Sequence, residues 1–202
     1  MLKFLKIFYL TISLICFSSF NIKAVAEEIT IGIDFGFGFL DIGAEDTAQE
    51  IANISGSTVT ASYDTGAWLG RVYGDFKVAD STYLDIGFFV TGDVEAKYTL
   101  SGATVTESYS ANGLDASVLF KEGRKEGGFV KAGIHSSTVD GNANVTISGT
   151  TYAANAAASG TGFLAGAGYD YEDGGRAGVS YYSNLGGLSK ADLLYIYYGF
   201  RF

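Results

Sequence analysis

The chain has 202 residues and a formal net charge of −9 at pH 7, with 28 glycines, 15% aromatic residues and no proline. This excess of negative charge excludes nucleic acid as a natural partner, because basic surfaces bind the phosphate backbone. The length fits one domain behind a short leader.

The start of the chain has the features of a secretory signal peptide. Lys3 and Lys6 give a basic beginning, a mostly apolar stretch follows, and Ala24–Ala26 supplies a small-x-small cleavage pattern. We therefore expect residues 1–26 to be removed and residues 27–202 to form the mature domain. Without Lys3, Lys6 and Lys23, the 13 basic residues fall to 10 against 22 acidic ones, a net charge of −12.

The composition of the mature part predicts an all-β chain. It contains no cysteine, since Cys16 lies in the leader, so its stability is expected from backbone pairing and burial. Many glycines and aromatic residues suit sheet structure, and the absence of proline suits long, fully hydrogen-bonded strands. No stretch beyond the leader approaches the roughly 20 apolar residues that a spanning helix needs.

Alternation of apolar and polar residues marks the strands, because side chains on a strand point to opposite faces with a period of two. The clearest case is Ile29–Phe39, where isoleucine and phenylalanine alternate with threonine, glycine and aspartate. Its length matches the roughly 9–11 residues of a tilted membrane strand. The same pattern predicts seven more strands: Trp68–Phe76, Leu84–Tyr98, Leu114–Lys121, Phe129–His135, Phe163–Tyr171, Arg176–Tyr181 and Leu193–Phe202.

The connections between these strands alternate between long and short. We expect long polar loops at 41–65, 101–112, 137–160 and 183–190, and short links at 78–81, 122–127 and 172–175. Long loops on one side and short turns on the other are typical of outer-membrane barrels. An even number of strands predicts that both mature termini lie in the periplasm.

The last predicted strand places aliphatic and aromatic residues on one face and closes on phenylalanine. This face includes Ile196, Tyr198, Phe200 and Phe202. The ending resembles the C-terminal signature of bacterial outer-membrane β-barrels, and the strand and loop pattern makes residues 27–202 similar to the small eight-stranded OmpA/OmpX-type family. The resemblance implies an all-β, antiparallel, up-and-down transmembrane barrel in a Gram-negative outer membrane. It also implies recognition of the C-terminal strand by the barrel-assembly machinery, and contact with membrane lipid and lipopolysaccharide.

The two faces of the barrel are assigned from glycine and charge, because alternation alone does not say which face is outside. Glycine concentrates on the polar face, as a narrow lumen crowded with long side chains requires. The charges of this face nearly balance, and buried charges need partners because an unpaired one is costly to desolvate. We therefore expect a lumen charge network of Asp34, Arg71, Asp75, Asp85, Asp93, Glu95, Lys97, Asp115, Lys121, Lys131, Asp170, Arg176 and Arg201.

The apolar face is expected to meet lipid. Aromatic residues near strand ends on this face belong in the two interfacial girdles of a membrane barrel. The residues assigned to them are Trp68, Tyr98, Tyr169, Tyr171 and Phe202.

Paired charges in so narrow a lumen predict a plugged barrel, because eight strands leave an interior that side chains fill. We expect a non-enzymatic protein without a cofactor, whose structural or surface-interaction role is carried by the extracellular loops. The ligand of those loops is not readable from the sequence. A narrow porin-like channel for small solutes is the first alternative, and bilayer conductance discriminates it.

A lipid A-modifying enzyme is the second alternative. His135, the only histidine, precedes Ser136 and Ser137, and such a set with an acid would suit acyl transfer. The simpler interpretation is an inward-pointing imidazole at the rim. The run Tyr181–Asn184 resembles the His-x-Ser-Asn motif of the outer-membrane lipid A deacylases, but tyrosine replaces the catalytic base, so we predict no catalytic residue.

A metal site is not predicted either. Asp140–Asn144 begins like a calcium loop but lacks the glycine and the closing glutamate of that motif. The acidic segment 41–65 is expected to be solvated, with weak divalent-cation bridging to lipopolysaccharide phosphates as the alternative.

Overall fold

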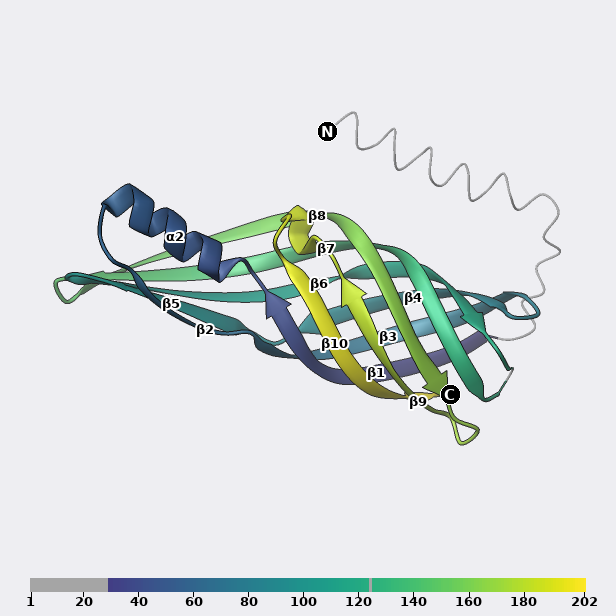
Figure 1. The fold of residues 1–202 in the computed structure, drawn as a ribbon. Helices are drawn as coiled ribbons and strands as arrows, with labels where there is room; N and C mark the ends of the chain where they lie inside the picture. Colours follow the sequence, from purple (N-terminus) through teal and green to yellow (C-terminus); the bar gives the residue numbers. More distant parts are fainter. Residues whose placement is uncertain (1–28, 124) are drawn as a thin grey trace, which may run out of the picture.

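The computed structural model describes residues 29–123 and 125–202. Its strands form one antiparallel sheet (Figure 1). The predicted signal peptide lies outside the described residues. The elements are β1 (Ile29–Asp41), α2 (Ala44–Ser55), β2 (Thr60–Asp64), β3 (Gly66–Ala79), β4 (Thr82–Thr91), β5 (Val94–Leu100), β6 (Ala103–Lys121), β7 (Gly127–Ile147), β8 (Thr150–Asp170), β9 (Gly175–Tyr182), the 3-10 helix η1 (Leu185–Gly187) and β10 (Asp192–Arg201).

Eight of these strands close into a barrel. The order around the ring is β1-β3-β4-β6-β7-β8-β9-β10, which follows the chain, and β10 pairs with β1. At this closing pair Phe35 lies opposite Tyr198, and Phe37 lies opposite Ile196. The predicted eight-stranded, antiparallel, up-and-down barrel is therefore confirmed.

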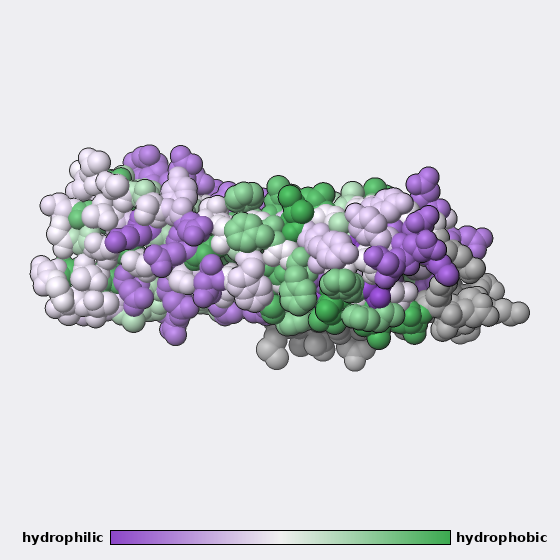
Figure 2. Space-filling model, turned by 90° about the horizontal axis from the view of Figure 1, so that it is seen from below, coloured by the Kyte–Doolittle hydropathy of each residue, from purple (hydrophilic) through white to green (hydrophobic). Residues whose placement is uncertain are grey.

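The apolar face of the barrel points outward. Phe35 is 62% exposed and Ile196 is 71% exposed, whereas the neighbouring Asp34 and Arg71 are buried inside. In Figure 2 the outward residues form a hydrophobic band between two hydrophilic ends. Lipid requires this arrangement, because acyl chains bury apolar atoms and a closed barrel leaves no unpaired backbone in the span. Neither helix of the described residues is long and apolar enough to cross a membrane.

At one end of the barrel the sheet continues beyond the hydrophobic band. β7 and β8 have 21 residues each, against 8 in β9 and 10 in β10. Their far ends join β6, β5 and β2 in an open sheet of order β2-β5-β6-β7-β8. We call this part the extension and define it as residues 41–66, 92–112, 137–162 and 183–192.

Much of the extension lies where the sequence predicted loops, and those predictions were wrong. Residues 103–112 and 137–147 pair along β6 and β7, and residues 150–160 pair with β7. The tight turns contain Gly102 and Gly149, whose φ values of +80° and +83° suit glycine. Small residues such as threonine, asparagine and alanine resemble a loop in composition, but here they form a single-layer sheet whose two faces are both partly exposed to water.

The predicted first loop, 41–65, contains a packed helix and a strand. Ala44, Ala48 and Ile51 of α2 belong to a cluster with Ala96 and Tyr98 of β5. The helix is bounded by Gly43 and Gly56, both in the left-handed conformation. Asp46 forms an exposed salt bridge of 2.6 Å with Lys190, which ties the helix to the segment before β10.

The predicted strand Leu84–Tyr98 is two strands with a break at Gly92-Asp93. The break reverses the alternation, because both strands pair with β6 and residues 91–93 lie opposite only Ser110 and Ala111 of that strand. Beyond the break, β2 replaces β3 as the other neighbour. Val94, Ala96 and Tyr98 are therefore buried, so the prediction of Tyr98 as a girdle residue is wrong. Asp93, Glu95 and Lys97 point outward and are exposed, and their assignment to the lumen network is also wrong.

Candidate functional site

Large lumen side chains lie over glycines of neighbouring strands. A Cβ added at Gly87 would lie 2.5 Å from the Nε atom of Arg71, and one at Gly178 would lie 2.6 Å from the Oη atom of Tyr197. These glycines leave room where long side chains cross a narrow interior. The glycine pattern of the polar face is thus the steric complement of the charged and aromatic filling.

Arg71 of β3 is the centre of the first charge cluster. Its Nε atom donates to Asp115 Oδ2 at 2.9 Å, and its Nη2 atom donates to Asp115 Oδ1 at 2.5 Å. It also donates to Asp85, and the Oη atom of Tyr182 donates to Asp115 Oδ2 at 2.9 Å. The planar guanidinium suits this two-carboxylate arrangement because its donors are fixed in a fork.

Arg176 of β9 is the centre of the second cluster, nearer the short turns. Its Nε atom donates to Asp170 Oδ1 at 2.7 Å, and its Nη2 atom donates to Asp75 Oδ2 at 2.7 Å. Lys121 also pairs with Asp170, and Arg201 Nη1 lies 3.0 Å from Asp170 Oδ2. Asp75 and Arg176 come from strands that are not neighbours in the ring, so this network spans the lumen.

Asp34 and Lys131 complete the predicted network but are held less tightly. Both carboxylate oxygens of Asp34 lack a hydrogen-bond donor among the described residues, and the nearest cationic nitrogen, Arg71 Nη1, is 3.7 Å away. Lys131 Nζ lies 5.9 Å from the centroid of the Tyr197 ring. Ten of the thirteen predicted network residues therefore line the lumen: Asp34, Arg71, Asp75, Asp85, Asp115, Lys121, Lys131, Asp170, Arg176 and Arg201.

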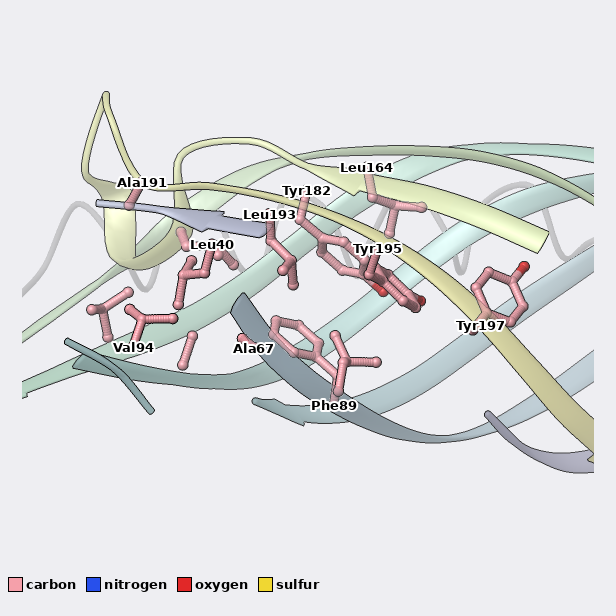
Figure 3. Close-up of a cluster of buried hydrophobic side chains, with 14 of the residues drawn as sticks. Leu40, Ala67, Phe89, Val94, Leu164, Tyr182, Ala191, Leu193, Tyr195 and Tyr197 are labelled. Carbon is pink, nitrogen blue, oxygen red and sulfur yellow. The ribbon is translucent and has the colours of Figure 1, made fainter. Parts of the chain in front are cut away.

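Above the charges, toward the extension, the lumen is closed by apolar and aromatic side chains. Figure 3 shows Leu40, Val94, Ala191 and Leu193 near the extension and the tyrosines farther down the barrel. Leu40 and Leu193 are fully buried. Buried side chains therefore line the interior from the two ionic clusters to this apolar layer.

The tyrosines of the lumen were not assigned a role from the sequence. Tyr73, Tyr182, Tyr195 and Tyr197 are all buried. The Arg71 and Arg176 guanidinium carbons lie 4.9 and 4.7 Å from the centroid of the Tyr73 ring, which adds cation–π contact to each cluster. Alternation places tyrosines next to the charges on the inward face, and this is the signal that would have identified them.

The residues considered for catalysis do not form a catalytic set. His135 points inward with its Nε2 atom 2.8 Å from the backbone oxygen of Ser183. Ser136 is exposed on the opposite face, and Ser137 Oγ accepts a hydrogen bond from the Gly186 amide at 2.9 Å. No group of three or more metal-ligating side chains occurs within residues 29–123 and 125–202.

The surface of the extension is strongly acidic. Its basic residues are Lys97 and Lys190, and its acidic residues are Asp41, Glu45, Asp46, Glu50, Asp64, Asp93, Glu95, Glu107, Asp140 and Asp192. Tyr109 Oη donates to Glu107 Oε2 at 2.9 Å. Burial, with the charge of Glu107 adding to it, raises the pKa of Tyr98 to about 12. Tyr98 therefore stays a neutral phenol at any physiological pH.

Comparisons with known proteins give structural neighbours only. No protein-family model and no curated protein matches the chain. Ail, the attachment invasion locus protein of Yersinia pestis, matches over 87% of this chain and 99% of that chain, with a TM-score of 0.53 and 12% identity. This chain has the fold of the small outer-membrane β-barrels.

Two further solved structures match the chain. A second structure of Ail, in complex with the heparin analogue sucrose octasulfate, has a TM-score of 0.51 and 13% identity over 87% of this chain and 99% of that one. Neisserial surface protein A has a TM-score of 0.39 and 14% identity over 86% of this chain and 95% of that chain. At these identities the likeness concerns the fold, and the function rests on this chain's own residues.

Proposed function

We propose that this protein is a non-enzymatic, non-conducting barrel of the outer membrane that presents the extension as a contact surface outside the cell. The observation that carries the proposal is that the sheet continues past the hydrophobic band, where helix α2 packs against it. Lipid and the lumen clusters need no such structure. An ordered sheet above the membrane is a rigid scaffold for recognition.

The filled lumen supports a non-conducting barrel. Arg71, Arg176 and their carboxylate partners occupy the cross-section, and Leu40 and Leu193 seal the side toward the extension. A porin-like path would require these ionic contacts to separate, which leaves buried charges unpaired at a cost of several kcal/mol. No specific contact among the described residues favours the channel or the enzyme alternative.

The proposal includes an orientation and two kinds of partner. Both ends of the barrel sheet, at Ile29 and Arg201, lie at the short-turn end, which we assign to the periplasm (Figure 1). Lipid and lipopolysaccharide would surround the band. The outward face of β10, with Tyr198, Phe200 and Phe202 exposed, would be the surface that the barrel-assembly machinery reads.

The charge of the contact surface does not suit the kind of ligand that is bound in one of the Ail structures. The Ail structure with sucrose octasulfate describes a highly sulfated ligand. Here the extension carries ten acidic residues against Lys97 and Lys190, so it would repel a polyanion. We therefore propose recognition through backbone and small polar groups of the sheet.

A trimmed variant tests the proposal. Residues 143–154 are replaced by an Asn-Gly turn between Asn142 and Asn155, which face each other across β7 and β8. We expect the variant to keep the altered gel mobility of a folded unboiled barrel but to lose adhesion of expressing cells to one another or to coated surfaces. Both proteins should leave planar bilayers at baseline conductance and lipid A at unchanged mass. Full adhesion by the trimmed variant, or steady porin-like currents, would contradict the proposal.

A further inference from the structure

Among residues 29–123 and 125–202, one long edge of the extension has no partner strand. β7 pairs with β8 along its whole length from Thr150, but β9 pairs with β8 only from Leu164 to Asp170. Every residue from Thr150 to Ala157 is exposed. Toward the barrel this open edge ends where Gly160 approaches Gly187 of η1, with their Cα atoms close enough to exclude side chains.

This edge also lacks the features that usually protect an exposed strand. Natural edges carry charges, prolines or bulges that prevent pairing with other chains. From Gly141 to Tyr169 there is no charged residue and no proline, and the β7–β8 register has no shift. The opposite edge of the same sheet, β2, is five residues long, ends on Asp64 and lies beside α2.

The direction of the free backbone groups follows from the last paired residues. The Phe163 amide donates to Ser183 Oγ at 3.2 Å, and the Phe163 carbonyl accepts from the Ser183 amide at 2.9 Å, both on the β9 side. Backbone groups alternate along a strand. Thr151, Ala153, Asn155 and Ala157 therefore direct their N–H and C=O groups to the open edge.

The sequence of this edge is self-complementary. Residues 153–157 read Ala-Ala-Asn-Ala-Ala, the same in both directions, with Tyr152 and Ala158 on either side. A two-fold axis through Asn155 would place Asn155 opposite its copy and Ala153 opposite Ala157, all of them edge-directed. Tyr152, which is 61% exposed, would lie opposite the small Ala158 of the second copy. Small residues opposite a large one allow close cross-strand packing.

We propose that the open edge of β8, which lies in the uncharged part of the otherwise acidic extension, pairs antiparallel with the same edge of a second copy of this chain. The inference rests on the proposed function, for which it names the partner. Antiparallel pairing directs the two barrels away from each other, so the second copy belongs to a facing membrane. The arrangement is an isologous contact. The pair of Asn155 residues and the two Ala153–Ala157 pairs would together form about six backbone hydrogen bonds across the contact.

Cysteine cross-linking tests this geometry. The sole cysteine of the sequence is Cys16, within the predicted leader, so Asn155→Cys gives one thiol in the mature chain. Directly opposed residues of a hydrogen-bonded pair have Cα atoms about 5.5 Å apart, within disulfide reach. The matched control is Asn142→Cys, which lies opposite Asn155 on the same face but one strand inward. Its two copies would be about 14 Å apart, at three strand spacings.

With each variant of the full mature chain in phosphatidylcholine vesicles, mild oxidation should give at least tenfold more disulfide dimer for Asn155→Cys than for Asn142→Cys. Equal dimer yields, or none, would overturn the proposal. Light scattering supplies a second readout. Asn155→Lys should abolish vesicle clustering because two lysines then face each other, whereas Asn142→Lys should retain it because the charges lie beyond a Debye length of about 8–10 Å.

The two proposals fail in different ways. If the trimmed variant loses adhesion but Asn155→Cys gives no dimer, the extension contacts some other molecule and only the self-pairing is wrong. If the trimmed variant keeps full adhesion, the proposed function itself is wrong.

Discussion

The lumen contains two buried aspartates whose replacement by alanine should change the stability of the barrel by very different amounts. Asp115 accepts hydrogen bonds from Arg71 Nε, Arg71 Nη2 and Tyr182 Oη. Asp34 accepts none from any described residue, and Arg71 Nη1 lies 3.7 Å away. Both side chains are fully buried, and replacing either by alanine removes one negative charge.

The expected magnitudes follow from these partners. Asp115→Ala removes the acceptor of three hydrogen bonds, two from the buried Arg71 guanidinium and one from the Tyr182 phenol, and leaves Arg71 hydrogen-bonded to Asp85 alone among the described residues, which costs about 3–5 kcal/mol. Asp34→Ala removes a desolvated charge that has little compensation, so we expect a change within about 1 kcal/mol, of either sign.

Urea unfolding in lipid vesicles measures the difference. The sequence has one tryptophan, Trp68, which lies on the outward face and is 54% exposed, so its fluorescence reports loss of the lipid environment. With a slope of about 2 kcal/mol per molar urea, Asp115→Ala should lower the midpoint by about 2 M. Asp34→Ala should leave it nearly unchanged. Equal losses of stability would refute the idea that hydrogen bonding, and not charge alone, holds this cluster.

Two further predictions use matched pairs. Gly87→Ala should destabilise the barrel by about 1–3 kcal/mol, because its Cβ would displace the Arg71 guanidinium, whereas Gly70→Ala, whose nearest contact would be 3.7 Å, should be nearly neutral in the same urea assay. Val72→Lys, in the middle of the outward face of β3, should cost about 2–4 kcal/mol, and Val78→Lys, near the short turn, only about 0–1 kcal/mol. Comparable midpoints for the two lysine variants would contradict the placement of the hydrophobic band.

The barrel could be predicted from the sequence because one physical rule controls it. Lipid outside and a crowded lumen inside require a strict period of two. In segments such as Ile29–Phe39 the alternation therefore predicts both the length of the strand and the face to which each side chain points. The same rule located Asp34, Arg71 and Arg176 in the lumen. It did not say which carboxylate each arginine holds, because that depends on register between strands distant in the sequence.

The strands of the extension could not be predicted from the sequence, because the period-of-two rule applies only within the membrane. Above the band both faces of the sheet meet water, so Thr150–Gly160 needs no alternation to be a strand. The break at Gly92-Asp93 reverses the facing of Val94, Ala96 and Tyr98 through a one-residue shift in the register with β6. Alternation within one segment does not reveal such a shift. Helix α2 is short and mostly polar, and its contacts with β5 are formed only in the folded sheet.

The reach of Arg176 across the interior has a consequence for how the protein enters its membrane. Asp75 on β3 and Arg176 on β9 meet at 2.7 Å although β1 and β10 separate their strands around the ring. A partly assembled sheet would expose Asp75 to hydrocarbon without its cation, whereas Arg176 would keep Asp170 on the adjacent strand β8. We therefore expect β3 to enter the hydrocarbon only as the ring closes, since the counter-ion of Asp75 lies on β9.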